Sequence, residues 1–266
     1  MQDSYGRTIR YLRISVTDRC NLRCHYCLPD GNEELLRRED LLSFEEISHV
    51  SRAALELGFK KIRLTGGEPL VRAGIVDLVG MVASLQGLED FSMTTNGVLL
   101  ESYADALVRA GLQRVNISLD TVDPVKFREI TRGGDFSKVL AGIEAAKRAG
   151  FAKIKLNCVV ERSSTETDAQ QVAKFAAERD IEVRFIRHMN LAEGTFWVVE
   201  GGSGGQCDQC DRLRVSSDGI VRPCLFSNVG FSVRELGARE AIERAVRDKP
   251  KSGEQCHNTT FRRIGG

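Results

Sequence analysis

Three cysteines lie close together near the start of the chain. Cys20, Cys24 and Cys27 form a CxxxCxxC pattern directly after a run of β-type residues. Three thiolates on one short loop can hold three irons of a cubane iron–sulfur cluster and leave the fourth iron without a protein ligand. An open metal position is where a substrate or cofactor binds. The alternative is a single zinc ion with His25 as fourth ligand, although neighbouring ligands pack poorly around one tetrahedral ion.

A second group of cysteines lies in the last quarter of the chain. Cys207, Cys210 and Cys224 form this group, with Arg212 and Arg214 between them. The set predicts an auxiliary iron–sulfur cluster whose fourth iron can hold a substrate. The guanidinium groups beside it are suited to phosphate or carboxylate.

The fourth ligand of this second set stays open in the sequence. A structural zinc knuckle closed by Cys256 or His257 fits the same spacing. If Cys256 closed an iron–sulfur cluster instead, a substrate could not bind its iron, and an electron-transfer role would follow.

The rest of the chain predicts the frame that positions these cysteines. Six β-type runs alternate with five segments of helical spacing. The runs cover 9–17, 60–65, 90–95, 113–119, 152–160 and 181–186, and the helical segments cover 44–57, 75–85, 103–110, 136–149 and 168–178. This alternation predicts an α/β protein with parallel strands joined by right-handed crossovers, either a complete or partial βα barrel or an open doubly wound sheet.

Cationic and glycine-rich residues lie on or just after these strands. Gly66–Pro69 follows the second run, and Arg13, Arg63, Lys155 and Arg184 lie in or at the ends of four different runs. Alternation in a barrel can aim such cations inward, which predicts a local pocket for a triphosphate. Solvated edge charges or structural ion pairs are the alternative for each of them.

The composition limits the classes of partner. The 266 residues carry 38 Lys and Arg against 37 Asp and Glu, a net charge of +1. This balance argues against broad binding to nucleic acid or to an anionic membrane. No run reaches the roughly 20 apolar residues that span a bilayer, and the first eight residues are polar. We therefore expect a cytoplasmic protein in which clustered cysteines bind metal rather than form disulfides.

The βα pattern ends near Asn190, and Gly201–Gly205 has the composition of a flexible hinge. The sequence therefore predicts two domains, a barrel over 1–190 and a small C-terminal domain over 191–266. The second domain contains the second cysteine set, one helix around 238–247 and a tail that ends in two glycines.

The cysteine loop after the first strand and the GGEP sequence after the second resemble the radical S-adenosylmethionine superfamily. The resemblance implies a partial (βα)6 TIM-like barrel in which Cys20, Cys24 and Cys27 hold a catalytic 4Fe-4S cluster. The amino and carboxylate groups of S-adenosylmethionine would chelate its fourth iron. One electron, from a donor such as flavodoxin or ferredoxin, would then yield a 5′-deoxyadenosyl radical.

Longer stretches, spread in order over nearly the whole chain, are similar to the GTP 3′,8-cyclase family of molybdenum cofactor biosynthesis. These stretches are Arg10–Cys20, Lys61–Pro69, Thr94–Gly97, Asn116–Asp120, Arg184–Ile186, Cys210–Arg214 and Gly265–Gly266. The resemblance implies two 4Fe-4S clusters, S-adenosylmethionine, GTP as substrate and a possible homodimer. In this family the radical takes hydrogen from the ribose C3′, and the resulting radical attacks guanine C8.

The resemblance also assigns roles by position. Residues implied to bind S-adenosylmethionine are Tyr26, Gly66, Gly67, Glu68, Ser118 and Met189. Residues implied to bind GTP are Arg13, Arg63, Thr94, Lys155, Arg212 and Arg214. Arg184 joins this group through its place on a predicted strand. The double-glycine tail, Gly265 and Gly266, is implied to enter the active site. The auxiliary cluster would use Cys207, Cys210 and Cys224 and bind the guanine ring at its open iron.

The sequence departs from the family in one region. Cys207 follows Arg187 by only 20 positions, where family members usually carry several further tens of residues. Where the family pattern has an acidic residue after the sixth strand, this chain has Arg187, followed by His188. A radical enzyme that modifies a ribosomal peptide is the alternative function, and a zinc-stabilised binding module is the non-enzymatic one.

Overall fold

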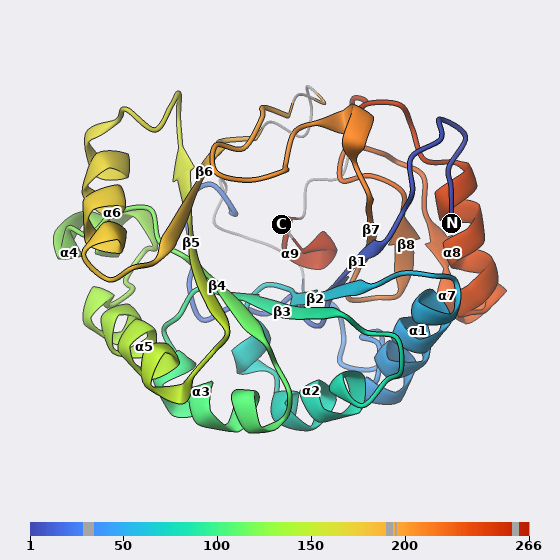
Figure 1. Cartoon of the computed structure of the whole chain (residues 1–266), viewed down its shortest axis with the longest axis horizontal. Coiled ribbons are helices and arrows are strands. Elements are labelled where there is room, and N and C mark those ends of the chain that lie inside the picture. Colours follow the sequence, from blue (N-terminus) through green and yellow to red (C-terminus); the bar gives the residue numbers. More distant parts are fainter. Residues whose placement is uncertain (29–34, 190–193, 195, 257–260, 266) are drawn as a thin grey trace.

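The computed structural model describes residues 1–28, 35–189, 194, 196–256 and 261–265. Six parallel strands pair in chain order along one curved sheet (Figure 1). The strands are β1 (Tyr11–Ser15), β2 (Lys61–Thr65), β3 (Asp90–Thr95), β4 (Arg114–Ser118), β5 (Lys153–Val160) and β6 (Glu182–Arg187). All six predicted strands are confirmed. Because β6 is an end strand of the described sheet, the barrel is partial, as the resemblance implied.

Helices cover the outer side of this curve (Figure 1). They are α1 (Phe44–Glu56), α2 (Ile75–Ala83), α3 (Leu100–Arg109), α4 (Pro124–Ile130), α5 (Phe136–Ala149) and α6 (Thr167–Ala177), with a short 3-10 turn η1 (Pro69–Val71). Ser43 and Glu46 form a reciprocal capping box at the start of α1. The sequence analysis did not predict α4, although Asp123 caps it and Pro124 occupies its first position.

The C-terminal part of the chain extends the same sheet. β7 (Arg212–Val215) pairs in parallel with β1, and β8 (Ile220–Arg222) and β9 (Phe231–Ser232) continue antiparallel. The 3-10 turn η3 (Cys207–Gln209) precedes β7, and α7 (Val233–Leu236), α8 (Ala238–Arg247) and α9 (Phe261–Ile264) complete the described elements. The division of the chain near residue 190 stays a prediction. Any such division cuts one continuous nine-stranded sheet.

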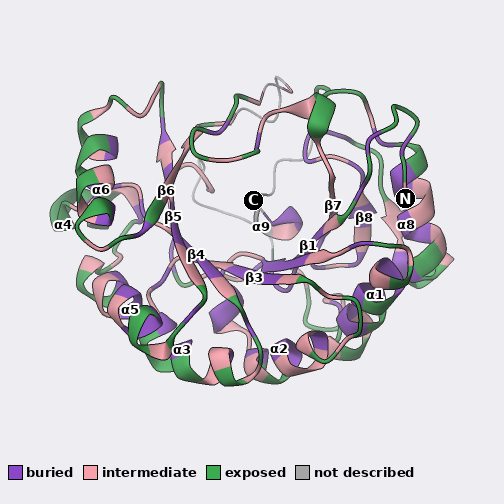
Figure 2. Cartoon of the chain, in the orientation of Figure 1, coloured by how far each residue is buried: buried purple, intermediate pink, exposed green. Residues whose placement is uncertain are grey.

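One large hydrophobic core lies between the sheet and its helices. Buried residues follow the strands and the sheet-facing sides of the helices (Figure 2). The core runs from Ile9 to Val246 and includes Leu213 of β7 and Ile242 of α8, which packs against α1. A small second cluster consists of Leu225, Phe226, Cys256 and Ile264. No described helix is long and apolar enough to cross a membrane.

Candidate active site

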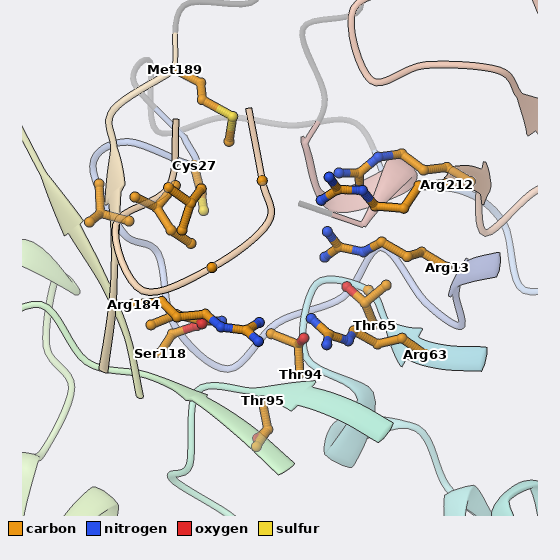
Figure 3. Close-up of a pocket in the computed structure, with 18 of the residues that line it drawn as sticks. Arg13, Cys27, Arg63, Thr65, Thr94, Thr95, Ser118, Arg184, Met189 and Arg212 are labelled. Carbon is orange, nitrogen blue, oxygen red and sulfur yellow. The ribbon is translucent and has the colours of Figure 1, made fainter. Parts of the chain in front are cut away.

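A cavity of about 450 Å³ lies inside the curve of the sheet, and β1 to β7 all contribute side chains to it. Most of the predicted site residues line it, namely Arg13, Cys20, Cys24, Tyr26, Cys27, Arg63, Gly66, Gly67, Thr94, Ser118, Arg184, Met189, Arg212 and Arg214. In Figure 3, Cys27 and Met189 lie on one side, and the guanidinium groups of Arg13, Arg63 and Arg212 point in from the other. The cavity therefore joins the first cysteine loop to the predicted cationic pocket.

The first cysteine loop is held against the end of α4. The amides of Cys27 and Leu28 both donate to the carbonyl of Cys24, at 3.1 and 3.0 Å, which turns the chain between the second and third cysteines. The amide of His25 donates to the carbonyl of Ile130. The ring Nε2 of His25 lies 2.9 Å from the carbonyl oxygen of Glu129, so this nitrogen is the donor and only Nδ1 remains for a metal.

The two glycines of the GGEP sequence allow a close approach of two loops. The amide of Gly67 donates to the carbonyl of Thr17 at 2.7 Å, and the amide of Glu68 donates to the carbonyl of Arg19 at 2.8 Å. A Cβ atom at Gly67 would lie 2.3 Å from that Arg19 oxygen, and one at Gly66 would lie 2.6 Å from the Thr17 oxygen. Only glycine fits there, and the turn is thereby fixed beside Cys20.

The carboxylate of Glu68 is buried and does not line the cavity. It accepts hydrogen bonds from the amide of Leu70 at 3.0 Å, the hydroxyl of Thr95 at 2.8 Å and the amide of Asn96 at 2.6 Å. Asn96 in turn places its side-chain nitrogen 3.7 Å from the Sγ of Cys20. Glu68 thus acts through Asn96 on the cysteine loop. Burial raises the pKa of Glu68 to about 7, and its three hydrogen bonds oppose this rise.

Replacing Glu68 with glutamine is expected to remove a pH-dependent part of the stability. Between about pH 4.5 and 7, native Glu68 holds a proton that the unfolded chain has released, so rising pH lowers the free energy of unfolding. The full change is about 3 kcal/mol. Urea unfolding of both proteins near about pH 5 and pH 8 measures it. An equal difference between wild type and Glu68→Gln at both pH values would contradict the raised pKa.

Tyr26 is anchored by a carboxylate that the sequence analysis did not assign to the site. Its hydroxyl donates to Asp120 at 2.8 Å, and the amide of Val159 donates to the other Asp120 oxygen at 2.8 Å. Burial raises the pKa of Asp120 and, more strongly, that of Tyr26, whose ionisation the nearby carboxylate further opposes. The neutral phenol therefore ties the cysteine loop to the ends of β4 and β5.

Three arginines form a row across three adjacent strands. Arg13 of β1 is in register with Arg63 of β2 and with Arg214 of β7. Residues in register on neighbouring parallel strands point to the same face, which here is the cavity. Burial and the charge of Arg214 hold the pKa of Arg13 well below its usual range, and burial and Arg212 lower that of Arg214 to about 10. Such a row is stabilised by a multivalent anion.

Polar atoms without partners lie near this row. Within the part of the chain that the structure describes, the hydroxyls of Tyr11 and Thr94, Oδ1 of Asn157 and Nε of Arg184 are buried and have no hydrogen-bond partner. Each buried unsatisfied group costs about 1–3 kcal/mol, so a polar ligand in the cavity is favoured. Tyr11 and Asn157 were missed from the sequence. Both lie two positions from a predicted site residue on the same strand, Arg13 and Lys155, and this period of two was the available signal.

Lys155 is not brought to the cavity. It is buried and forms an ion pair with Glu182, the first residue of β6 and its neighbour in register. Glu182 also pairs with Lys153, and the two lysines lower the pKa of Glu182 to about 2. The structural ion pair, one of the alternatives for the strand cations, is what the structure shows at Lys155. Its contact with GTP stays a prediction.

A short segment, residues 196–205, spans the cavity between β6 and β7, and we call it the strap. Phe185 and Glu200 exchange backbone hydrogen bonds of 3.1 Å, and the guanidinium carbon of Arg187 lies 3.8 Å from the ring centroid of Trp197. At the other end, Arg212 donates to the carbonyl of Ser203 at 2.9 Å. Phe196, Val199 and Gly202–Gly204 line the cavity from this side. The strap occupies the region where the sequence is shortened.

The second cysteine set lies beyond the arginine row. Cys207 begins η3, Cys210 follows that turn, and Cys224 follows β8, and none of the three lines the cavity. All three are free thiols. Arg214 lines the cavity, and its pKa is sensitive to both Cys210 and Cys224, so the second cysteine set lies near this end of the row.

The C-terminal tail reaches the same region. α9 packs against β1 inside the curve of the sheet (Figure 1). The carbonyl of Gly265 accepts a hydrogen bond from Arg214, and a Cβ at this glycine would lie 2.5 Å from the Thr65 side chain. Gly266 and His257 lie outside the described residues. Cys256 is buried in the small second core beside Cys224, with its Sγ 3.8 Å from the Leu225 carbonyl.

A family model of the radical SAM superfamily matches residues 14–176. The chain therefore belongs to the radical SAM superfamily and is an enzyme of that type. Within it, the chain belongs to the GTP 3′,8-cyclase family. It is 38% identical to the GTP 3′,8-cyclase of Petrotoga mobilis, over 98% of this chain and 97% of the relative. It is 34% identical to the GTP 3′,8-cyclase of Listeria welshimeri, over 100% of this chain and 99% of the relative.

The alignment with the Petrotoga protein also bears on the shortened region. It spans 313 positions, and this chain has 266 residues, so at least 47 positions hold no residue of this chain. Among solved structures, native anSMEcpe with bound AdoMet has a TM-score of 0.62 at 18% identity over 96% of this chain and 82% of that one. SuiB of Streptococcus suis has a TM-score of 0.63 at 15% identity, over 91% of this chain and 66% of that one. These likenesses confirm the fold.

Membership of the superfamily implies a 4Fe-4S cluster and S-adenosylmethionine. The first cysteine loop fits them, because the thiols of Cys20, Cys24 and Cys27 line the cavity beside buried polar atoms that have no hydrogen-bond partner among the described residues. The described residues contain no group of three His, Cys, Asp or Glu side chains placed to share a single metal ion.

Proposed function

We propose that this protein is a GTP 3′,8-cyclase that acts in molybdenum cofactor biosynthesis. The row of Arg63, Arg13 and Arg214, across the same cavity from the first cysteine loop, carries the proposal. Three cations in register on one buried face suit a triphosphate, and full-length relatives with 34–39% identity bear this name. GTP is therefore the proposed substrate.

The residues around the cavity divide into two proposed groups. Cys20, Cys24 and Cys27 hold the first cluster, and S-adenosylmethionine lies beside them, within reach of Tyr26, Gly66, Gly67, Ser118 and Met189. Arg13, Arg63, Arg184, Arg212 and Arg214 bind the triphosphate, and Thr94 and Asn157 offer hydrogen bonds to the ribose. The strap closes the side of the cavity between the two groups and excludes water from the reacting atoms.

When bound, the first cluster and S-adenosylmethionine supply a 5′-deoxyadenosyl radical, which takes the hydrogen from ribose C3′ before C3′ bonds to guanine C8. The chain orients these atoms by fixing the triphosphate at one end of the cavity and the cysteine loop at the other. Cys207, Cys210 and Cys224 are proposed to hold a second 4Fe-4S cluster near the guanine. A small redox protein such as flavodoxin or ferredoxin is the proposed electron donor.

Anaerobic reconstitution tests the proposal. The protein is loaded with iron and sulfide, its iron is counted, and it is incubated with S-adenosylmethionine, dithionite and GTP. About eight irons per chain, with GTP consumed in step with 5′-deoxyadenosine formation, is the expected result. Cleavage of S-adenosylmethionine with intact GTP would overturn the substrate and point to another one, such as a peptide.

A further inference from the structure

Two buried cations hold the segments that carry the second cysteine set. They are Arg7 and Lys249, which are 8% and 3% exposed. Lys249 donates to two backbone carbonyls of these segments, and Arg7 donates to the carbonyl of Cys207 and to two carbonyls of the turn that follows Lys249. Neither residue belongs to the cavity or to the site described above.

Lys249 joins two of the cysteines. Its Nζ donates to the carbonyl of Arg212 at 2.7 Å and to the carbonyl of Pro223 at 2.7 Å. Arg212 lies two positions after Cys210, and Pro223 directly precedes Cys224. One ammonium group therefore fixes the spacing between the strand after the second cysteine and the turn before the third.

Arg7 binds the backbone of the remaining cysteine, Cys207. Its Nη1 donates to the carbonyl of Cys207 at 2.6 Å, and its Nη2 donates to the carbonyl of Pro250 at 2.6 Å. Its Nε pairs with Asp3 at 2.6 Å, and both side chains are buried. Because Pro250 follows Lys249, the two cations fix the same turn, and the three cysteines are held through one connected network.

The two cations differ in charge balance. Asp3 neutralises Arg7, whereas among the described residues no carboxylate pairs with Lys249. A buried charge without a counter-charge is unfavourable, because it has lost its hydration. The two carbonyls that bind this ammonium belong to residues next to Cys224 and two positions after Cys210, so the charge lies at the backbone that carries two of the cysteines. An anionic cluster held by these cysteines would balance it.

We propose that Lys249 is the positioning and charge-compensating residue of the second cluster. This inference rests on the proposed function, since it takes the second cysteine set to hold a 4Fe-4S cluster. Reduction adds a negative charge to a cluster whose thiolates are already anionic, and a buried cation nearby stabilises the reduced form. Lys249 thus raises the reduction potential of the second cluster and reduces its loss of iron.

The test uses the full chain with Cys20, Cys24 and Cys27 replaced by alanine, so that only the second cluster remains. Lys249→Gln keeps an N–H donor and removes the charge, Lys249→Arg keeps the charge, and Lys251→Gln changes an exposed lysine two positions away as the matched control. The reduction potential is measured by a redox titration followed by electron paramagnetic resonance. Iron per chain is counted before and after gel filtration with a mild chelator.

We expect Lys249→Gln to have a lower reduction potential than the parent. The parent should hold about four irons per chain, and Lys249→Gln should lose at least about half of them. Lys249→Arg and Lys251→Gln should keep the potential and iron of the parent. Equal potentials in Lys249→Gln and the parent would overturn the inference. If Lys249→Gln does not fold, the reduction potential of Lys249→Arg is the test. A potential lower than that of the parent would overturn the role of the charge, and an unchanged potential would support it. A parent without iron would instead overturn the proposed second cluster.

Discussion

The Cys24→Ala protein is expected to form no 5′-deoxyadenosine from S-adenosylmethionine under dithionite. Cys24 is the middle cysteine of the first loop, and its carbonyl accepts the two amides that turn the chain toward Cys27. Alanine keeps this turn and removes the thiolate, so the loop retains its shape with one ligand fewer. We expect a fall in cleavage rate by a factor on the order of 10³ or more, and iron falling from about eight to about four per chain.

Cys158→Ala is the matched control for this substitution. Cys158 is fully buried in β5, and burial raises the pKa of its thiol, so it is not available as a thiolate ligand. Its replacement should leave both iron content and cleavage near wild-type values, with a loss of stability from the small cavity. Cleavage that persists in Cys24→Ala would assign the first cluster to other residues. Loss in both variants would show that folding, and not ligation, had been affected.

Replacing Arg13 with methionine should have the second largest effect, on GTP binding. Arg13 is the central cation of the row, between Arg63 and Arg214. A charge-assisted hydrogen bond to phosphate contributes about 1.5–3 kcal/mol, so the Kd for GTP should rise about 10- to 100-fold. Cleavage of S-adenosylmethionine without GTP should be unaffected. Isothermal titration calorimetry and 5′-deoxyadenosine analysis measure the two effects.

The same substitution should stabilise the protein in the absence of GTP. Arg13 is partly buried beside the positive charges of Arg214, Arg63 and Arg212, and methionine removes this repulsion. We expect the free energy of unfolding to rise by about 1 kcal/mol. Residues that serve binding often lower the stability of the fold, so replacing one of them can raise it. Arg10→Met, at an exposed position just before β1, is the control and should change neither quantity. Unchanged GTP affinity in Arg13→Met would remove the row from the substrate site.

The first 190 residues followed the sequence expectations closely, because their strands are apolar runs bounded by glycine or polar residues. α3 begins at Leu100, three residues earlier than predicted, since no side chain caps it. The strands β7 to β9 were missed because they have four residues or fewer and contain arginine and serine. No local pattern indicates that β7 pairs with β1, which is about 200 residues away in sequence.

The arrangement of the site could be predicted only in part, for the same reason. Motifs that are continuous in sequence placed the cysteine loop and the glycine turn correctly beside each other. The row of arginines and the Tyr26–Asp120 contact depend on register between strands, which the sequence does not reveal. For Lys155 the strand was predicted correctly, but the partner of its ion pair, Glu182 on the neighbouring strand, was not. Its contact with GTP stays a prediction.

The position of β1 in the middle of the sheet affects the order in which the strands can pair during synthesis. Its neighbours are β2 on one side and β7, made some 150 residues later, on the other. A growing chain can build the barrel from β1 to β6 while the β7 side of β1 is still an open edge, which is prone to pair with other chains. The residues that hold β7 in place, Arg7 and Lys249, lie near opposite ends of the sequence. The first cysteine loop is therefore complete in the growing chain before the residues that build the second cysteine set have been made.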